Sequence, residues 1–155
     1  MCTGTRLPIS RDDSPEWTCN FIAGMQRNAK DRAPLVVKAL GTAGVHRILD
    51  LGGGSGAYSI AFAKASPEVR CEILDVPEVV PLTADYVGKA GVSAQVGLRA
   101  GDMLQDDFGS GYDIIMLNAI CHMFSEEQNQ YIFLPRTLGT RAERSSCRAG
   151  FHPQS

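Results

Sequence analysis

The stretch Ile48-Leu-Asp-Leu-Gly-Gly-Gly-Ser-Gly56 decides the fold of this chain. Apolar residues without a turn former predict a short buried strand over residues 47–51. Four glycines follow within five residues, and residues 57–64 then have the composition of a helix. Glycine permits positive φ and close approach of a ligand, while the start of a helix presents free N–H groups. A strand, a glycine-rich turn and a helix in this order therefore predict a ligand-binding turn.

The residues around the glycines separate two classes of ligand. Gly52-x-Gly54-x-x-Ala57 fits the dinucleotide fingerprint. Asp50, however, lies two residues before the first glycine, where a carboxylate would face the pyrophosphate of NAD. S-adenosyl-L-methionine instead carries an ammonium and a sulfonium, which a carboxylate attracts. The acidic residue before the glycines therefore favours S-adenosyl-L-methionine as the cofactor, with an NAD-dependent oxidoreductase as an alternative.

Length and composition restrict the remaining possibilities. The chain has 155 residues, 44% of them apolar and 21% charged, which predicts a single globular domain. The net charge of −2 gives no electrostatic case for nucleic acid, and no apolar run approaches the ~20 residues that span a bilayer. Five cysteines without a CxxC pair predict neither a disulfide framework nor a metal site. We therefore expect reduced thiols in a cytoplasmic protein that binds no membrane.

Further elements follow from local signals along the chain. Residues 1–13 are expected to be disordered or a loop, and Ser14-Pro15-Glu16 predicts the start of a helix. A second helix is predicted over 33–40, ending at a glycine. Three more strands are predicted over 69–75, 93–100 and 112–117, with a helix over 81–88 between the first two. Ser125-Glu-Glu-Gln128 predicts a capping box that begins another helix. The alternation predicts an α/β fold with a parallel sheet.

Two more acids follow predicted strands. Asp75 lies 19 residues after Gly56, where an acid can bind the ribose hydroxyls, although it could also cap a helix. Asp102 follows the next strand, where it can accept from the adenine amine while Met103 packs on the purine; the alternative is a plain turn. Because ligands bind at the carboxyl ends of parallel strands, we expect Asp50, Asp75 and Asp102 to line one crevice.

Five sequence blocks resemble the S-adenosylmethionine-dependent O-methyltransferases of the caffeic acid and hydroxyindole type. The blocks are Phe21-Ile-Ala-Gly-Met25, Leu49-Asp-Leu-Gly-Gly-Gly-Ser-Gly56, Leu74-Asp-Val-Pro-Glu-Val79, Ala100-Gly-Asp-Met103 and Ile120-Cys-His-Met-Phe-Ser125. The resemblance runs from about residue 17 to residue 130. It implies a Rossmann-like class I methyltransferase fold, incomplete because the chain supplies strands one to four of the sheet and lacks the later ones. It also implies an enzyme that transfers a methyl group to a hydroxyl of a small aromatic molecule. It further implies a homodimeric family, whose dimerisation domain we expect to be absent from this chain.

The resemblance also implies roles for individual residues. His122 occupies the place of the catalytic histidine, in Ile-Cys-His-Met where relatives often have Ile-Cys-His-Asp, and an imidazole is a suitable base for a phenol. Phe21 and Met25 match residues that line the acceptor pocket, although a helical stripe of this kind can equally be core. The expected cofactor-binding residues are Asp50, Gly52, Gly54, Gly56, Asp75, Val76, Asp102, Met103 and Asn118. Asn118 stands where some relatives carry a cofactor-contacting lysine.

The resemblance stops after Gln130, which limits what this chain is expected to do. Residues 134–155 have no apolar periodicity, and our hypothesis is that this tail is translated out of frame, which the encoding DNA would test. Residues 14–133 would then form a truncated methyltransferase domain whose fourth strand is an exposed edge. We expect weak cofactor binding and little turnover from the 155-residue chain. The alternative is a non-catalytic, cofactor-binding fragment.

Overall fold

The computed structural model describes residues 14–118 and 121–132, except for the side chain of His122. The expectations for residues 1–13 and 134–155 fall outside the described residues.

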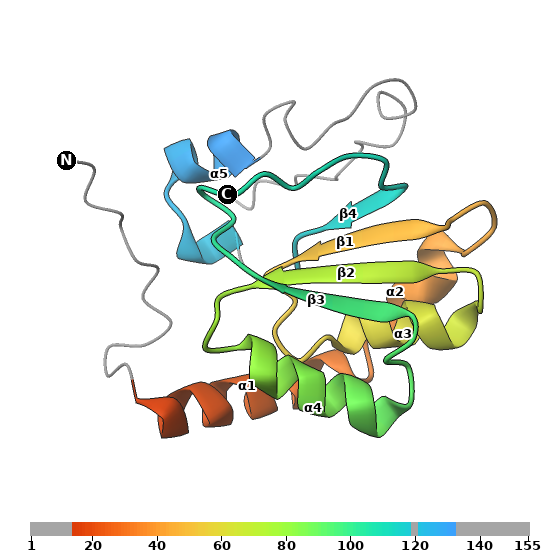
Figure 1. Cartoon of the computed structure of the whole chain (residues 1–155), viewed down its shortest axis with the longest axis horizontal. Coiled ribbons are helices and arrows are strands. Elements are labelled where there is room, and N and C mark those ends of the chain that lie inside the picture. The colour runs from red at the N-terminus through yellow and green to blue at the C-terminus, as the bar shows by residue number, and fades with distance from the viewer. Residues whose placement is uncertain (1–13, 119–120, 133–155) are drawn as a thin grey trace, which may run out of the picture.

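Four parallel strands form one sheet in the order β3-β2-β1-β4 (Figure 1). The strands are β1 (Arg47–Leu51), β2 (Arg70–Asp75), β3 (Val96–Ala100) and β4 (Ile114–Met116). The chain proceeds outward from β1 through β2 to β3, and then returns to the other side of β1 to form β4. The order therefore reverses between β1 and β4, and ligands in open α/β sheets bind beside the carboxyl ends of strands at such a point. The predicted α/β fold with a parallel sheet of four strands is confirmed.

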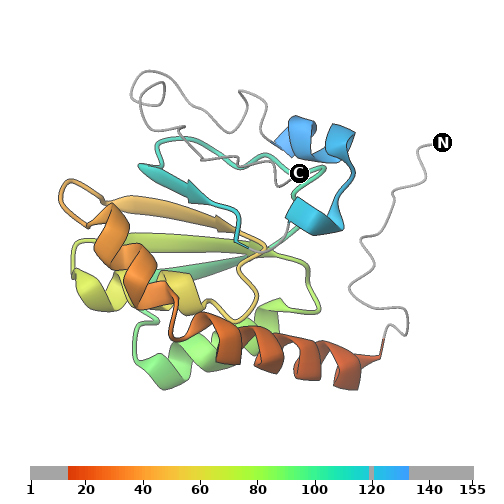
Figure 2. The same cartoon turned by 180° about the vertical axis from the view of Figure 1, so that it is seen from behind.

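Helices cover one face of the sheet more completely than the other (Figures 1 and 2). The helices are α1 (Pro15–Ala29), α2 (Ala33–Leu40), α3 (Ala57–Ala65), α4 (Val80–Ala90) and α5 (Glu126–Ile132), with a 3₁₀ turn η1 (Cys121–Met123) before α5. The core under α2, α3 and α4 contains Ile48, Phe62, Ile73 and Val87. A second core lies on the opposite face, where Leu49 and Leu51 of β1 pack with Phe108, Phe124 and Ile132. Burial on both faces explains the almost unbroken apolar character of β1.

Most predicted elements are confirmed with small changes of boundary. β1 and α2 have the predicted bounds. Ser14 caps α1 by accepting from the N–H of Trp17 at 3.2 Å. The capping box is also present: the N–H of Gln128 donates to Ser125 Oγ at 3.2 Å, and the N–H of Ser125 donates to Gln128 Oε1 at 2.9 Å. These local signals were reliable because each depends on a hydrogen bond between residues three apart.

β2 begins one residue later than predicted, whereas β3 and β4 are more clearly shorter than predicted, and the residue before each of these two contacts a neighbouring segment. Before β3, the Gln95 amide donates to three carbonyls, those of Ala63, Ser66 and Val69, at 2.9–3.1 Å. Before β4, the Asp113 carboxylate accepts from the N–H groups of His46 and Arg47 at 2.7 and 2.8 Å. Both side chains therefore tie the start of a strand to a neighbouring segment.

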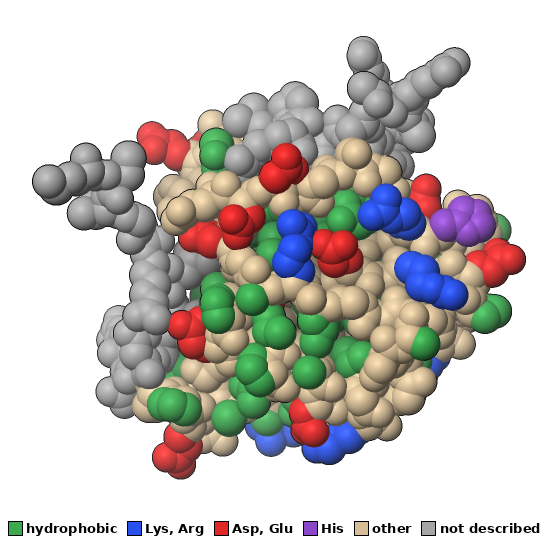
Figure 3. Space-filling model, viewed as in Figure 1, with side chains coloured by type: hydrophobic (Ala, Val, Ile, Leu, Met, Phe, Trp, Pro, Cys, Tyr) green, Lys and Arg blue, Asp and Glu red, His purple; other side chains and the backbone are tan. Residues whose placement is uncertain are grey.

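None of the helices among residues 14–118 and 121–132 is long and apolar enough to cross a bilayer. Acidic and basic side chains are interspersed over the face shown in Figure 3, without a large area of one sign.

Candidate functional site

The glycine-rich turn connects β1 to α3 through three left-handed residues. Gly52, Gly54 and Gly56 have φ of 63°, 58° and 76°, a region that other residues rarely adopt. Gly56 is the N-cap of α3, and its N–H donates to Gly53 O at 2.9 Å. The N–H of Gly52 donates to Leu74 O at 2.8 Å, so the turn is also joined to β2. Glycine is therefore required for the backbone path of this turn.

The side chains of Asp75 and Thr83 form hydrogen bonds with the backbone of Gly54, in the middle of the turn. One carboxylate oxygen of Asp75, at the end of β2, accepts from the N–H of Gly54 at 2.8 Å. The hydroxyl of Thr83, a fully buried residue of α4, donates to Gly54 O at 2.5 Å. Both backbone groups of Gly54 are consequently fixed by side chains.

Each oxygen of the Asp75 carboxylate accepts one hydrogen bond from the protein backbone. Asp75 is 9% exposed, and its second oxygen accepts from the N–H of Val76 at 2.8 Å. Burial raises the pKa of Asp75 above its ordinary value, while the hydrogen bonds from Gly54 and Val76 oppose this shift. A carboxylate can accept about four hydrogen bonds, so each oxygen of Asp75 retains capacity for a ligand hydroxyl.

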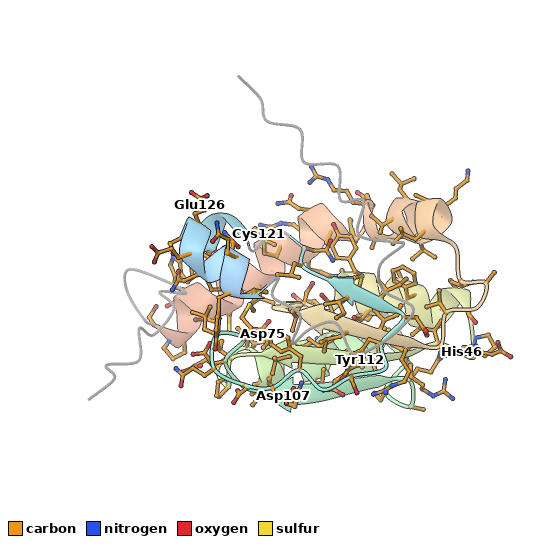
Figure 4. All side chains as sticks on the ribbon, turned by 90° about the horizontal axis from the view of Figure 1, so that it is seen from above. His46, Asp75, Asp107, Tyr112, Cys121 and Glu126 are labelled. Atoms are coloured by element: carbon orange, nitrogen blue, oxygen red, sulfur yellow. The ribbon has the colours of Figure 1, made fainter. Side chains whose placement is uncertain are left out.

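A cavity opens at the carboxyl ends of the strands, between the glycine-rich turn, α1 and the η1 region. Figure 4 shows Asp75, Cys121 and Glu126 at this end of the molecule, and His46 at the opposite end. The residues that line the cavity are Phe21, Ile22, Met25, Asn28, Ala29, Arg32, Gly52, Gly53, Gly54, Ser55, Ala57, Tyr58, Asp75, Val76, Val79, Met103, Asn118, Met123 and Phe124. Segments that are far apart in the sequence therefore build one site.

Most of the predicted site residues meet in this cavity. They are Phe21, Met25, Gly52, Gly54, Asp75, Val76, Met103 and Asn118. Three predicted cofactor-binding residues, namely Asp50, Gly56 and Asp102, are not among the lining residues. Of the three acids expected to line one crevice, only Asp75 lines this cavity, and the cofactor-binding roles of Asp50 and Asp102 stay predictions.

Asp50 lies behind the glycine-rich turn, on the helix-covered side of β1. It is 1% exposed, and one of its carboxylate oxygens accepts from Ser59 Oγ at 2.8 Å. Its other oxygen has no hydrogen-bond partner among the described residues. Burial raises the pKa of Asp50 to about 7, and the charge of Asp75 adds to this shift. Asp50 therefore supports the turn from within the core and does not face the cavity.

Asp102 is turned toward its own loop. Its two oxygens accept from the N–H of Leu104 at 2.8 Å and from the side-chain amide of Gln105 at 3.1 Å. The next residue, Met103, is 4% exposed and lines the cavity. The predicted Asp-Met pair thus supplies its methionine, and not its acid, to the cavity wall.

His122 is placed only through its backbone. It is the middle residue of η1, and Met123 and Phe124 immediately after it line the cavity. The prediction that its imidazole is a catalytic base lies outside what the structure describes.

Sequence patterns could have indicated some of the lining residues that were missed. Asn28 and Arg32 continue the stripe of Phe21 and Met25 at helical spacing, although Arg32 lies just beyond the end of α1. Tyr58 follows the glycine-rich turn directly, in the first turn of α3. Because the apolar part of the stripe ends at Met25, an apolar pattern alone does not include Asn28 and Arg32.

Asn118 carries an unsatisfied polar atom beside the cavity. Its side-chain nitrogen is buried and has no hydrogen-bond partner among the described residues. An orphaned buried amide is unusual in a folded protein. A polar ligand in the cavity would supply the missing partner, which is consistent with a binding site here.

Comparisons with known proteins identify one family. The family model of the O-methyltransferase domain matches residues 4–138. The L-tyrosine C(3)-methyltransferase of Streptomyces lavendulae is 36% identical over 94 residues, 61% of this chain and 26% of that protein. An O-methyltransferase family 2 protein from Planctomyces limnophilus, solved in complex with apigenin, has a TM-score of 0.67 at 31% identity, over 81% of this chain and 38% of its own. The S-adenosylmethionine-dependent methyltransferase SibL has a TM-score of 0.64 at 28% identity, over 72% of this chain and 33% of its own.

Proposed function

We propose that this chain, which belongs to the O-methyltransferase domain family, binds S-adenosyl-L-methionine in the cavity beside Asp75 and serves methyl transfer to a hydroxyl of a small aromatic molecule. The chain spans 26% to 38% of the lengths of the relatives described above. The activity is therefore proposed from the site, with the named activities of the relatives as support.

The hydrogen bonds of the glycine-rich turn carry the proposal. The N–H groups of Gly52, Gly54 and Gly56 donate to protein oxygens, those of Leu74, Asp75 and Gly53. A dinucleotide site of the G-x-G-x-x-G/A type uses the backbone of this turn and the following helix to bind the pyrophosphate. Here three of these donors are engaged within the protein, which leaves fewer of them for a phosphate. A phosphate-free adenosine cofactor fits this arrangement better than NAD.

The remaining lining residues also fit S-adenosyl-L-methionine. Asp75 offers acceptor capacity for the two ribose hydroxyls, and the thioether of Met103 offers a polarisable surface for a purine. Asn118 offers the unpartnered amide. When bound, the cofactor supplies an electrophilic methyl group on a sulfonium.

The chain's own residues would orient the acceptor and remove its proton. Trp17 and Phe21 stack with ring centroids 5.0 Å apart, and Phe21 and Met25 line the cavity from α1. An apolar, aromatic wall of this kind suits a planar acceptor. A phenol has a pKa near 10, so a base is needed at neutral pH, and His122 in η1 is the proposed base.

Methylation at a ring carbon is a second candidate, because one relative is named for methyl transfer to C3 of L-tyrosine. The ring carbon would then lose its proton to the base after the new carbon–carbon bond forms. Incubation with trideuteromethyl-labelled S-adenosyl-L-methionine and either L-tyrosine or apigenin, followed by NMR of any product, separates the two reactions.

Equilibrium binding tests the proposal directly. We expect the chain to bind S-adenosylhomocysteine more tightly than NADH, with Trp17, the only tryptophan, as a fluorescence reporter. Asp75→Asn should weaken S-adenosylhomocysteine binding by about 10-fold or more, because hydrogen bonds to a charged group are strong. Asp85→Asn, at an exposed position of α4, is the matched control and should leave the affinity for S-adenosylhomocysteine unchanged. Tighter binding of NADH than of S-adenosylhomocysteine would refute the proposal.

The catalytic base has its own test. We expect His122→Ala to lower the rate of methyl transfer by about 100-fold or more while the dissociation constant for S-adenosylhomocysteine stays unchanged. An unchanged rate in this variant would exclude His122 as the base.

A further inference from the structure

The cavity wall carries two charged side chains among the residues that the structure describes, and they have opposite signs. Asp75 carries the negative charge, and Arg32 carries the positive charge. The proposed function uses Asp75 but leaves Arg32 without a role. A cation in the wall of a cofactor cavity can pair with an anionic group of the ligand.

Arg32 has a fixed backbone and an unengaged head group. It lies between α1 and α2, where its N–H donates to Ala29 O at 3.0 Å and its carbonyl accepts from Leu35 and Val36 at 3.0 and 3.1 Å. Its side chain is exposed, and its guanidinium makes no hydrogen bond or ion pair with another residue of the described ranges. The backbone of Arg32 is therefore fixed beside the cavity, and its guanidinium is available to a ligand.

The surroundings of Arg32 place it on the helical side of the cavity. Asn28, four residues earlier, lines the same wall, and so do Ala57 and Tyr58 at the start of α3. α2, which begins directly after Arg32, packs against α3. Asp75 instead ends β2. The two charges thus come from different layers of the fold, one from the helical layer and one from the sheet.

We propose that Arg32 binds the α-carboxylate of S-adenosyl-L-methionine. This inference rests on the proposed function. The cofactor has one carboxylate at one end and a ribose diol nearer the adenine, which matches one guanidinium and one carboxylate in the cavity wall. A guanidinium presents paired N–H donors in a planar fork that fits a carboxylate. An ammonium or sulfonium would be repelled by Arg32, so the carboxylate is the part of the cofactor that this residue can recognise.

Two ligands that differ in the amino-acid moiety test this assignment. S-adenosylhomocysteine carries the carboxylate, whereas 5′-methylthioadenosine shares the adenosine and thioether but lacks the amino-acid group. We expect Arg32→Gln to weaken S-adenosylhomocysteine binding by about 10-fold or more and to leave 5′-methylthioadenosine binding unchanged. Arg27→Gln, at an exposed position of α1 that does not line the cavity, is the matched control and should affect neither ligand.

Each other outcome has a definite meaning. Equal weakening of both ligands, or no change in either, in Arg32→Gln overturns the role of Arg32 while the proposed function stands. No binding of S-adenosylhomocysteine by the unaltered chain overturns both. If only the binding of L-tyrosine, measured in the presence of S-adenosylhomocysteine, is weakened in the variant, Arg32 binds a carboxylate of the acceptor and the cofactor assignment is wrong. Arg32→Lys should restore part of the lost affinity, because the charge remains without the planar fork.

Discussion

Replacing Asp50 by asparagine should remove a large part of the pH dependence of stability. In the folded chain Asp50 is 1% exposed and its pKa is raised from 3.8 to about 7 by burial. An unfolded chain ionises this group near 3.8. Between these two pH values the folded state retains a proton that the unfolded state has lost. The free energy of unfolding therefore falls as pH rises from about 4 to 7, and this contribution is constant at higher pH.

The size of the effect follows from the pKa difference. A shift of about 3 pH units corresponds to about 4 kcal/mol, since each unit is worth about 1.4 kcal/mol. Over a practical range from pH 5 to 8, the loss for Asp50 alone is about 3 kcal/mol. This is a large fraction of the ~5–15 kcal/mol that stabilises a typical domain. Asparagine does not ionise, so Asp50→Asn has no such contribution.

Urea unfolding at pH 5 and pH 8 measures the effect. From pH 5 to pH 8, the free energy of unfolding of the unaltered chain should fall by about 3 kcal/mol more than that of Asp50→Asn. The asparagine also places an amide where one oxygen of Asp50 has no described partner, which lowers stability equally at both pH values. Cys71, whose pKa burial raises to about 12, stays neutral throughout. If the free energy of unfolding changes equally with pH in both chains, Asp50 ionises near its ordinary pKa in the folded state. The conclusion that Asp50 is buried behind the turn would then be wrong.

Two further changes test how the glycine-rich turn is held. Thr83→Val keeps the side-chain shape but removes the hydroxyl that donates to Gly54 O. The free energy of unfolding should fall by about 1 kcal/mol, and S-adenosylhomocysteine should bind more weakly. Unchanged binding would show that the turn does not need this hydrogen bond. Gly53→Ala places a Cβ 2.7 Å from a methyl carbon of Ile73, and should lower the unfolding free energy by about 1–3 kcal/mol in a urea titration. Gly88→Ala is the control, because Gly88 lies in α4 with no heavy atom within 4 Å of the new Cβ. This change should raise the free energy of unfolding by up to about 1 kcal/mol. Destabilisation by both changes would indicate a general intolerance of alanine.

Local sequence determined the framework of this protein. The bounds of β1, the left-handed glycines after it, and the caps at Ser14 and Ser125 all depend on residues within a few positions of one another. The position of Asp75 also followed from sequence, because a side chain at the end of a parallel strand faces the common ligand edge. The methyl-donor prediction depended instead on Asp50 before the glycines, on Asp102, and on the resemblance of five short blocks; neither acid lines the cavity.

Only the tertiary structure decided which polar groups face the cavity. Alternation along β1 indicates that Asp50 and Leu49 point to opposite faces, but the packing of Ser59 of α3 against the turn decides that Asp50 is buried. Asp102 is directed by hydrogen bonds within its own loop, which a strand pattern does not reveal. Arg32 follows the end of α1 and lines the same cavity as the glycine-rich turn, which a helical pattern alone does not reveal. Sequence fixes the order of the elements and their backbone turns, whereas the direction of a side chain at a site depends on contacts between elements that are distant in sequence.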